Sequence, residues 1–109
     1  MNYKILITSE FKKEIKHLSK KYSSIRTDFD VFLKQLTQDP FQGTSIGKNC
    51  YKIRLAIKSK GRGKSGGARI ITYVQIISET VLLISIYDKS EVSTITDKVI
   101  NERIKNSLP

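Results

Sequence analysis

The residues best suited to chemistry are lysines and arginines concentrated in the middle of the chain. The sequence of 109 residues has 20 basic and 10 acidic side chains, which gives a formal net charge of +10. Residues 40–78 contain no Asp or Glu, so this segment cannot neutralise its charge locally. Solubility alone could explain the surplus, but ordinary solvated surfaces mix both signs, and we therefore favour a polyanionic partner. The basic residues of the segment are Lys48, Lys52, Arg54, Lys58, Lys60, Arg62, Lys64 and Arg69.

Four basic side chains are expected to converge on one face of a β-sheet as a reaction centre. Lys52 and Arg54 are two residues apart in an alternating segment, so both point to the same side of a strand. Arg69 begins the next strand and can lie across from them, and Lys89 follows the third strand. Arginine matches a phosphate bidentately, whereas lysine offers a point charge. The alternative for Lys52 and Arg54 is the solvated face of a strand.

A second group of residues is expected to bind nucleic acid without taking part in the chemistry. Most of its basic members lie in or beside a Gly-rich loop over 59–67, which the sequence also allows to be a plain hairpin connection. This loop contains Gly63-Lys64-Ser65, but the earlier glycine of a phosphate-binding P-loop is missing and a strand follows, so we reject nucleotide binding. The two tyrosines of the group could stack on a base, although tyrosines more often pack. The group comprises Lys48, Lys58, Lys60, Arg62, Lys64, Tyr73 and Tyr87.

RNA cleavage is a reaction that such a site permits. Attack of a 2′-hydroxyl on the adjacent phosphate needs a base, an acid for the leaving oxygen and stabilisation of the phosphorane charge. His17 is the only histidine, and the cationic segment has no carboxylate that could hold a metal ion. Crowding of like charges disfavours protonation of lysines, so one lysine could act as the base while an arginine stabilises the developing charge. We expect no metal and no cofactor.

The hydrophobic periodicity predicts an α+β fold in the order β-α-α-β-β-β-α. A strand over 3–7 is followed by two amphipathic helices, the first beginning after Thr8-Ser9 and the second ending at Asp39-Pro40. Strands are expected over 51–57, 68–77 and 81–87, with loops over 41–49 and 59–67. A terminal helix is expected over 94–108. The elements should form a mainly antiparallel four-stranded sheet, packed by the helical hairpin and the terminal helix.

Length and composition indicate one soluble domain, residues 1–109. The sequence has no run of 18 apolar residues, which excludes a transmembrane helix of ordinary length. Cys50 is the only cysteine, so an internal disulfide cannot form. These features favour a reducing cytoplasm.

Three segments of the chain resemble the RelE/ParE superfamily of toxins from type II toxin–antitoxin systems. They are YKIRL at 51–55, SGGARIITY at 65–73 and ISIYDKSE at 84–91, and the basic loop over 58–67 is most similar to the HigB branch. The resemblance covers essentially the whole chain. It implies a toxin that enters the ribosomal A site, cleaves messenger RNA during translation and is held inactive by an antitoxin. It places the catalytic role on Lys52, Arg54 and Arg69, with Lys89 as the basic residue after the last strand.

The chain departs from the RelE-like pattern at two positions. Some RelE-like enzymes have an arginine directly after the position of Lys89, where this chain has Ser90. They also have a tyrosine in the terminal segment, whereas the corresponding residues 93–96 include none. Tyr87 or Tyr73 could substitute for it in the acid–base chemistry.

Three functions stay open at this point. The first is a ribosome-dependent mRNA endonuclease, the second is a ParE-like toxin that inhibits DNA gyrase, and the third is a non-catalytic nucleic-acid-binding module. The density of Lys and Arg on the central strands favours the first. The expected partners are the ribosome, mRNA and an antitoxin with acidic, amphipathic segments that covers the basic sheet face or displaces the terminal helix. We expect no membrane partner.

Overall fold

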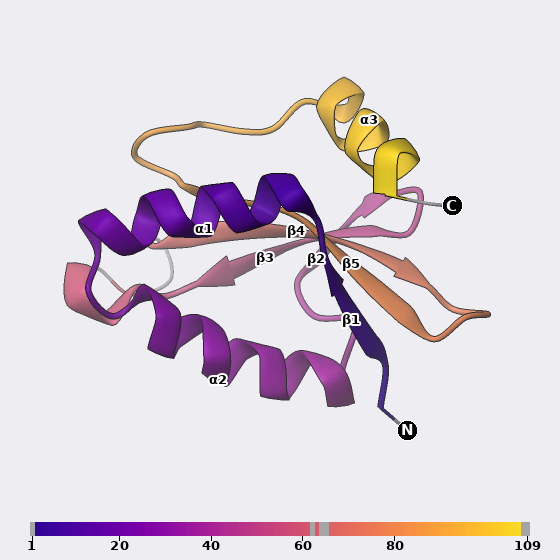
Figure 1. The fold of residues 1–109 in the computed structure, drawn as a ribbon, viewed down its shortest axis with the longest axis horizontal. Coiled ribbons are helices and arrows are strands. Elements are labelled where there is room, and N and C mark those ends of the chain that lie inside the picture. The colour runs from indigo at the N-terminus through magenta and orange to yellow at the C-terminus, as the bar shows by residue number, and fades with distance from the viewer. Residues whose placement is uncertain (1, 62, 64–65, 108–109) are drawn as a thin grey trace.

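A mixed five-stranded sheet with helices on both faces forms the fold (Figure 1). The structure is a computed structural model that describes residues 2–61, 63 and 66–107. Its strands are β1 (Lys4–Ile7), β2 (Thr44–Gly47), β3 (Cys50–Leu55), β4 (Ala68–Gln75) and β5 (Thr80–Asp88). Its helices are α1 (Ser9–Lys21), α2 (Ile25–Gln38) and α3 (Asp97–Ser107), with a short 3₁₀ helix, η1 (Lys58–Lys60). The strand order is β1-β5-β4-β3-β2, in which β1 runs parallel to β5 and the other pairs are antiparallel.

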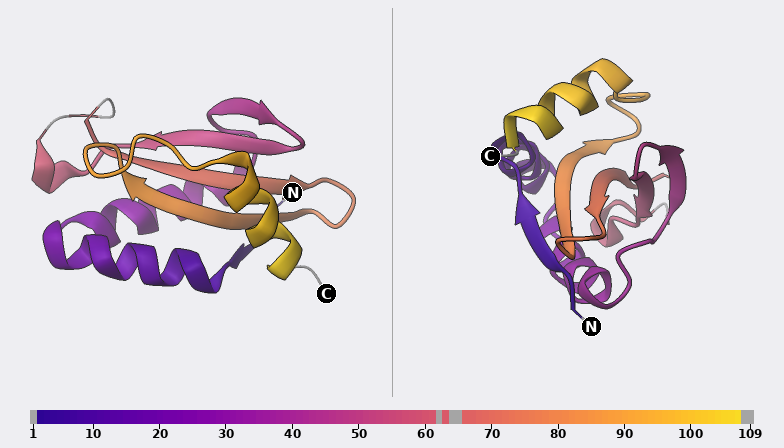
Figure 2. Two further views of the ribbon diagram at one scale, coloured as in Figure 1. Left: turned by 90° about the horizontal axis from the view of Figure 1, so that it is seen from above. Right: turned by 90° about the vertical axis from the view of Figure 1, so that its right-hand side faces the viewer.

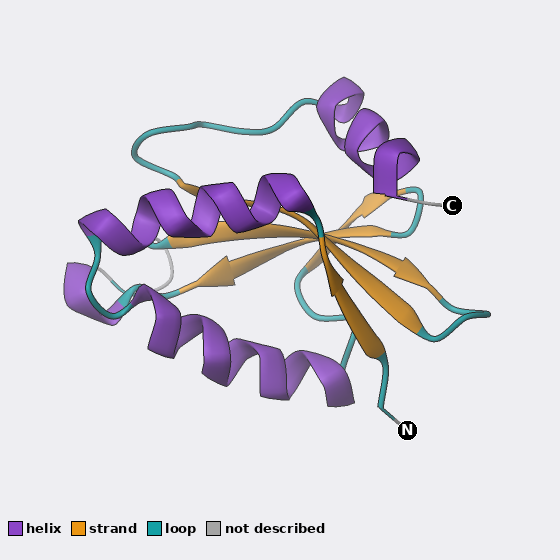
Figure 3. Ribbon diagram, in the orientation of Figure 1, coloured by secondary structure: helices purple, strands orange, loops and turns teal. Residues whose placement is uncertain are grey.

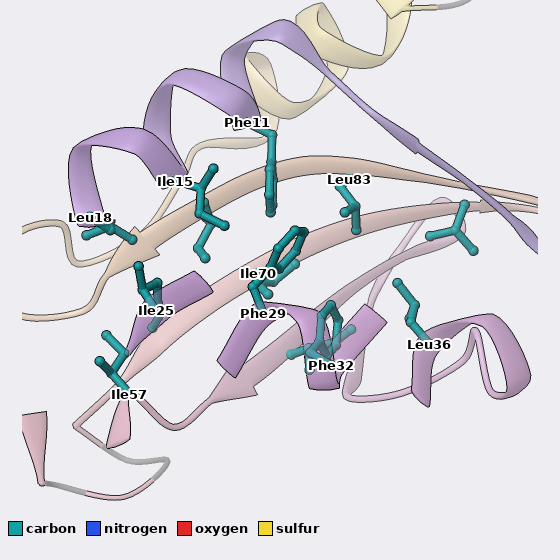
Figure 4. Close-up of a cluster of buried hydrophobic side chains, with 14 of the residues drawn as sticks. Phe11, Ile15, Leu18, Ile25, Phe29, Phe32, Leu36, Ile57, Ile70 and Leu83 are labelled. Carbon is teal, nitrogen blue, oxygen red and sulfur yellow. The ribbon is translucent and has the colours of Figure 1, made fainter. Parts of the chain in front are cut away.

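The α1–α2 hairpin covers one face of the sheet, as the hydrophobic periodicity predicts (Figures 2 and 4). The hydroxyl of Thr8 accepts a hydrogen bond from the backbone N–H of Phe11 at 3.2 Å, which satisfies one free donor at the start of α1. Apolar residues of both helices then meet the inward side of β3, β4 and β5, and this burial is the main stabilising term of the fold. The buried helical residues of this core are Phe11, Ile15, Leu18, Ile25, Phe29, Phe32 and Leu36.

The terminal helix α3 covers part of the opposite sheet face. Ile100 is buried in α3 and packs with Ile71, Leu82 and Ile84 of the two longest strands. Cys50 at the start of β3 also belongs to this second cluster, whereas Arg54 farther along β3 is exposed to solvent. The long connection over 89–96 joins β5 to α3 (Figure 3).

The edge of β5 is capped by side chains beyond the point where β1 ends. The Glu14 carboxylate accepts hydrogen bonds from the backbone N–H of Ile86 at 3.3 Å and from the hydroxyl of Ser85 at 3.1 Å. Arg103 of α3 donates to the carbonyl of Ile84 at 3.1 Å and to Glu14 at 3.0 Å. These contacts satisfy backbone groups that would otherwise form an open strand edge.

The α+β class and the order of the predicted elements are confirmed, and the main differences are in the bounds of the elements and in one additional strand. β2 is an additional edge strand where a loop was predicted, and it gives the sheet five strands. β3 ends at Leu55 rather than at Ile57, and β4 ends at Gln75 because Ile76 and Ile77 enter the turn before β5. Helix α3 begins at Asp97, three residues later than predicted. Within the described residues, no helix is long and apolar enough to cross a membrane.

Candidate active site

The register of three strands brings the predicted reaction centre together. Arg54 of β3 pairs with Arg69 of β4, and Arg69 pairs in turn with Tyr87 of β5. Lys52 is two residues before Arg54 and therefore lies on the same face of β3. Lys89 directly follows β5, and its backbone N–H donates to the carbonyl of Gly67 at 3.4 Å. The predicted pairing of Arg69 with β3 is confirmed.

A pocket of about 620 Å³ opens where these side chains meet. All four predicted catalytic residues line it, together with Tyr87 from the predicted RNA-binding group. Its remaining walls come from the segment before and within β2, from β3 and from the connection after β5. The lining residues are Gln42, Gly43, Thr44, Ile46, Lys52, Ile53, Arg54, Arg69, Tyr87, Lys89 and Ser93.

The described residues that line the pocket carry positive charge. Among those that the structure describes, four are cationic and none is Asp or Glu. Arg69 is only 5 % exposed, Lys52 is half-buried, and Arg54 and Lys89 are exposed. Arg69 also donates to the backbone carbonyl of Ala68 at 3.2 Å. A pocket of this kind attracts a group with several negative oxygens, such as a phosphodiester.

Tyr87 lines this pocket and carries a buried hydroxyl. The residue is 4 % exposed and packs in the second cluster, so its ring face is unavailable for stacking on a base. Within the described part of the chain, its hydroxyl is buried and has no hydrogen-bond partner. A buried hydroxyl without a partner costs about 1–3 kcal/mol, and such groups in native structures call for an explanation. A pocket ligand that hydrogen-bonds this hydroxyl would supply one.

Gly43 forms the wall of the pocket beside Lys52. Its φ is +88°, and a Cβ atom at this position would lie 2.3 Å from the backbone oxygen of Lys52. Only glycine allows the chain before β2 to approach β3 this closely. Gly43 therefore helps to set the position of the Lys52 backbone.

Lys60 lies in a different environment from the one its predicted RNA-binding role requires. Its side chain is 12 % exposed, and its ammonium donates to Asp88 at 2.8 Å and to Ser90 Oγ at 3.2 Å. Burial alone would raise the pKa of Asp88, but hydrogen bonds from Lys60, Tyr22 and Ser90 hold it well below its usual range. We therefore leave Lys60 out of the RNA-binding surface proposed below.

The other predicted binding residues are spread over the molecule. Lys58 is exposed at the start of η1, and Lys48 is exposed in the β2–β3 turn, so both can reach a partner. Tyr73 pairs with Cys50 and packs beside the second cluster, and it is not among the residues that line the pocket. Arg62 and Lys64 lie outside the described residues.

Three polar lining residues were missed by the sequence reasoning. Gln42 and Thr44 belong to the segment that was read as a loop, and Ser93 lies in the connection between β5 and α3. Ser93 belongs to the stretch where RelE-like toxins carry a tyrosine, and this comparison was the one signal that could have indicated it. Gln42 and Thr44 gave no signal, because the pairing of β2 with β3 brings them to the pocket.

The remaining nucleophile and histidine lie apart from the pocket lining. Cys50 is buried, and burial raises the pKa of its thiol, which disfavours the reactive thiolate. His17 lies on α1 with its side chain 66 % exposed, 3.5 Å from the Glu91 carboxylate. Neither residue lines the pocket, so its chemistry depends on the cations and hydroxyls described above.

Known structures share this fold. No family model matches the sequence. A mutant of the E. coli toxin RelE in the free state is 22 % identical, with a TM-score of 0.61 over 99 % of this chain and 100 % of the RelE chain. A crystal structure of the isolated E. coli RelE toxin is 21 % identical, with a TM-score of 0.55 over 97 % of this chain and 99 % of that one. The chain therefore has the RelE fold over its whole length.

Proposed function

We propose that this protein is a RelE-like toxin of a toxin–antitoxin system that cleaves messenger RNA on the ribosome and so inhibits translation. The observation that carries the proposal is the pocket in which Lys52, Arg54, Arg69 and Lys89 meet. The RelE fold supports the same function by analogy. The HigB branch and the cytoplasmic location stay predictions from the sequence.

The proposed reaction is an internal displacement at one phosphodiester. The 2′-oxygen of a nucleotide bonds to the adjacent phosphorus, and the bond from phosphorus to the 5′-oxygen of the next nucleotide breaks. The products are a 2′,3′-cyclic phosphate and a 5′-hydroxyl. Arg54 and Arg69 are assigned to the negative charge that develops on the non-bridging oxygens.

Proton transfer is assigned to the remaining polar side chains of the pocket. Lys52 or Lys89 takes the proton from the 2′-hydroxyl or protonates the leaving 5′-oxygen, each in the required protonation state. The buried hydroxyl of Tyr87 and the hydroxyl of Ser93 supply further hydrogen bonds. Lys48 and Lys58 lie outside the pocket lining and are proposed to contact RNA or ribosome backbone.

The proposed partners follow from the charge of the molecule. The ribosome and messenger RNA supply phosphates for a chain with a net charge of +10. An antitoxin with acidic, amphipathic segments would neutralise the pocket by covering the basic sheet face or by displacing α3. A structure of the complex in which the antitoxin touches neither region would contradict this part of the proposal.

Inducible expression followed by mapping of RNA ends tests the activity. We expect growth arrest and cuts within the codons of translated messages, with 5′-hydroxyl ends that a polynucleotide kinase labels without prior phosphatase treatment. Arg54→Ala and Arg69→Ala should each lower cleavage by about 10²-fold or more if they stabilise the transition state. Lys34→Ala is the matched control, because Lys34 is an exposed cation of α2 outside the pocket.

The other candidate functions predict different outcomes of the same experiment. A gyrase inhibitor of the ParE type would leave messages intact while DNA breaks accumulate. A non-catalytic module would bind RNA without growth arrest. Either result would replace the nuclease assignment.

A further inference from the structure

Tyr22, Lys60 and Ser90 form a network around the buried carboxylate of Asp88, called the Asp88 network, beside the candidate active site. The side chain of Asp88 is fully buried at the end of β5. Its carboxylate accepts hydrogen bonds from Tyr22 Oη at 2.5 Å, Lys60 Nζ at 2.8 Å, Ser90 N at 2.9 Å and Ser90 Oγ at 2.7 Å. One carboxylate therefore joins the end of α1, the 3₁₀ helix η1 and the connection after β5.

Lys89 is held between the two anchored residues of this network. Asp88 precedes it and Ser90 follows it, and both are fixed by the same carboxylate. The backbone N–H of Lys89 is itself bonded to the carbonyl of Gly67. Among the four cations of the pocket, Lys89 is the one that follows its strand rather than lying within the sheet, so its position depends on these neighbours.

The partner cation of the network is itself delivered by an anchored turn. The backbone N–H of Lys58 donates to the Asp28 carboxylate at 3.0 Å, and that of Ser59 donates to Ser24 Oγ at 2.8 Å. Ser24 also donates to Asp28 at 2.8 Å. These bonds hold η1 against the α1–α2 turn. The backbone from which the Lys60 side chain extends to Asp88 therefore has a defined position.

Stability alone is a weak explanation for this arrangement. Removing two charges from water costs nearly as much as their attraction returns, and apolar pairs of similar size often stabilise a core as well or better. What an ion pair with several hydrogen bonds does provide is a defined geometry. This geometry is fixed next to a residue that lines the pocket.

We propose that the Asp88–Lys60 pair is a positioning pair that sets the placement of Lys89 in the active-site pocket. This inference rests on the proposed function, because it assigns Lys89 a role in binding and cleaving RNA. Lys60 then acts through Asp88 and Ser90 rather than by touching RNA. The loop that contains Lys60 then contributes to the reaction through the placement of Lys89. The composition of this loop alone could not indicate such a role.

A double-mutant cycle between the network and Lys89 tests this proposal. Lys60→Met with Asp88→Asn removes both charges together, which avoids leaving a buried charge without its partner. We expect this double variant to fold and to cleave ribosome-bound message about tenfold more slowly than wild type, with a change mainly in kcat. Lys89→Ala should cost about tenfold in the wild-type background and less than twofold in the double-variant background.

Two further variants separate positioning from a general structural effect. Lys60→Arg keeps the charge and the donors, so it should retain most of the wild-type activity. Glu91→Gln removes a more exposed carboxylate beside the network that pairs with His17 and Lys21, and the effect of Lys89→Ala should stay tenfold in that background. Full additivity of Lys89→Ala with the double variant would overturn the proposal.

Binding of a short single-stranded RNA, measured in parallel, distinguishes this proposal from the proposed function. If wild type binds the RNA but does not cleave messages, the nuclease function fails. RNA-binding affinity then replaces the cleavage rate as the quantity measured in the double-mutant cycle. Lys89→Ala should weaken RNA binding in the wild-type background and have little effect on it in the double-variant background. If Lys89→Ala weakens binding equally in both backgrounds, or in neither, the positioning role is wrong.

Discussion

Two groups of cations lie at the same end of the sheet and are arranged in opposite ways. In the pocket, Arg54 and Arg69 line a cavity whose described lining residues include no carboxylate. In the Asp88 network, Lys60 is bonded to a buried carboxylate. Asp88, which pairs with Ala68, and Tyr87, which pairs with Arg69, are consecutive residues of β5. The pocket and the Asp88 network therefore adjoin neighbouring positions of this strand.

The difference follows from the alternation of side chains along a strand. Consecutive residues of β5 point to opposite faces, so Asp88 meets the side of the α1–α2 hairpin while Tyr87 packs in the second cluster. On one face, the Asp88 carboxylate binds the Lys60 ammonium within the protein. On the other face Lys52, Arg54 and Lys89 line a pocket whose described lining residues include no carboxylate. The same residue types can therefore have different surroundings at consecutive positions of one strand.

The largest effect on stability is expected from breaking the Asp88 network on one side. Asp88→Asn leaves the Lys60 ammonium largely buried without its counter-ion, which should lower the free energy of unfolding by about 3–5 kcal/mol. Urea unfolding at pH 7 measures this loss. Glu91→Gln is the matched control, because its ion pairs are much more exposed and should contribute less than about 1 kcal/mol. Equal effects of both substitutions would show that the network is not a distinct buried unit.

A smaller effect is expected from disturbing the pocket without touching the network. Gly43→Ala adds a Cβ at φ +88°, 2.3 Å from the Lys52 oxygen, and should destabilise the fold by about 2–4 kcal/mol. Gly47→Ala has a similar φ of +90° but no atom within 4 Å of the added Cβ, so it should cost only about 1 kcal/mol. Thermal unfolding of the two variants isolates the steric term. If both lose the same stability, backbone strain alone explains them.

The contribution of the Asp88 network to the free energy of unfolding should depend on pH, because the Asp88 carboxylate ionises. Its pKa is held below the ordinary value by the hydrogen bonds from Lys60, Tyr22 and Ser90, although burial acts in the opposite direction. A depressed pKa contributes stability above the unfolded-state value of about 3.9, and this contribution is lost as the pH falls through the folded-state value. Between pH 7 and pH 3 the stability difference between wild type and Asp88→Asn should shrink by about 1 kcal/mol. A constant difference over that range would contradict the assigned ionisation.

The smallest effect is expected on stability when an exposed pocket cation is removed. Arg54→Ala should change the free energy of unfolding by less than about 0.5 kcal/mol. It should nevertheless reduce the salt dependence of single-stranded RNA binding by about 0.7 in the slope of log K against log salt concentration. In a Lys89→Ala background, Lys60→Met with Asp88→Asn should leave this slope unchanged, because Lys60 is already paired within the protein. A further reduction of the slope in that background would place Lys60 on the RNA surface after all.

The sequence predicts the parts of this molecule that depend on local periodicity. The two helices of the hairpin, the alternation of β3 and the shared face of Lys52 and Arg54 follow from spacing alone. Short edge strands lack a strong pattern of their own, so β2 was missed and its pairing with β3 could not be foreseen. The turn residues Ile76 and Ile77 are apolar but exposed, which extended the predicted strand beyond its true end.

Pairing between distant charges was the other feature that the sequence could not reveal. Lys60 and Asp88 are separated by 28 positions, and charge counting treats them as independent. Lys60 was therefore grouped with the loop cations. Ser93 reaches the pocket through a long connection, whose path is determined by where α3 packs.

The parallel pairing of β1 with β5 has a consequence for how the chain is made. Lys4 lies beside Thr80, and the Thr8 hydroxyl bonds to the carbonyl of Leu83 across 75 positions. Such contacts raise the contact order and slow folding, because a long loop must close before they form. During synthesis, the first strand has no partner until residues 80–83 have left the ribosomal tunnel. The pocket is lined by Lys89 and Ser93 as well, so a nascent chain cannot form the complete pocket before residue 93 has left the tunnel.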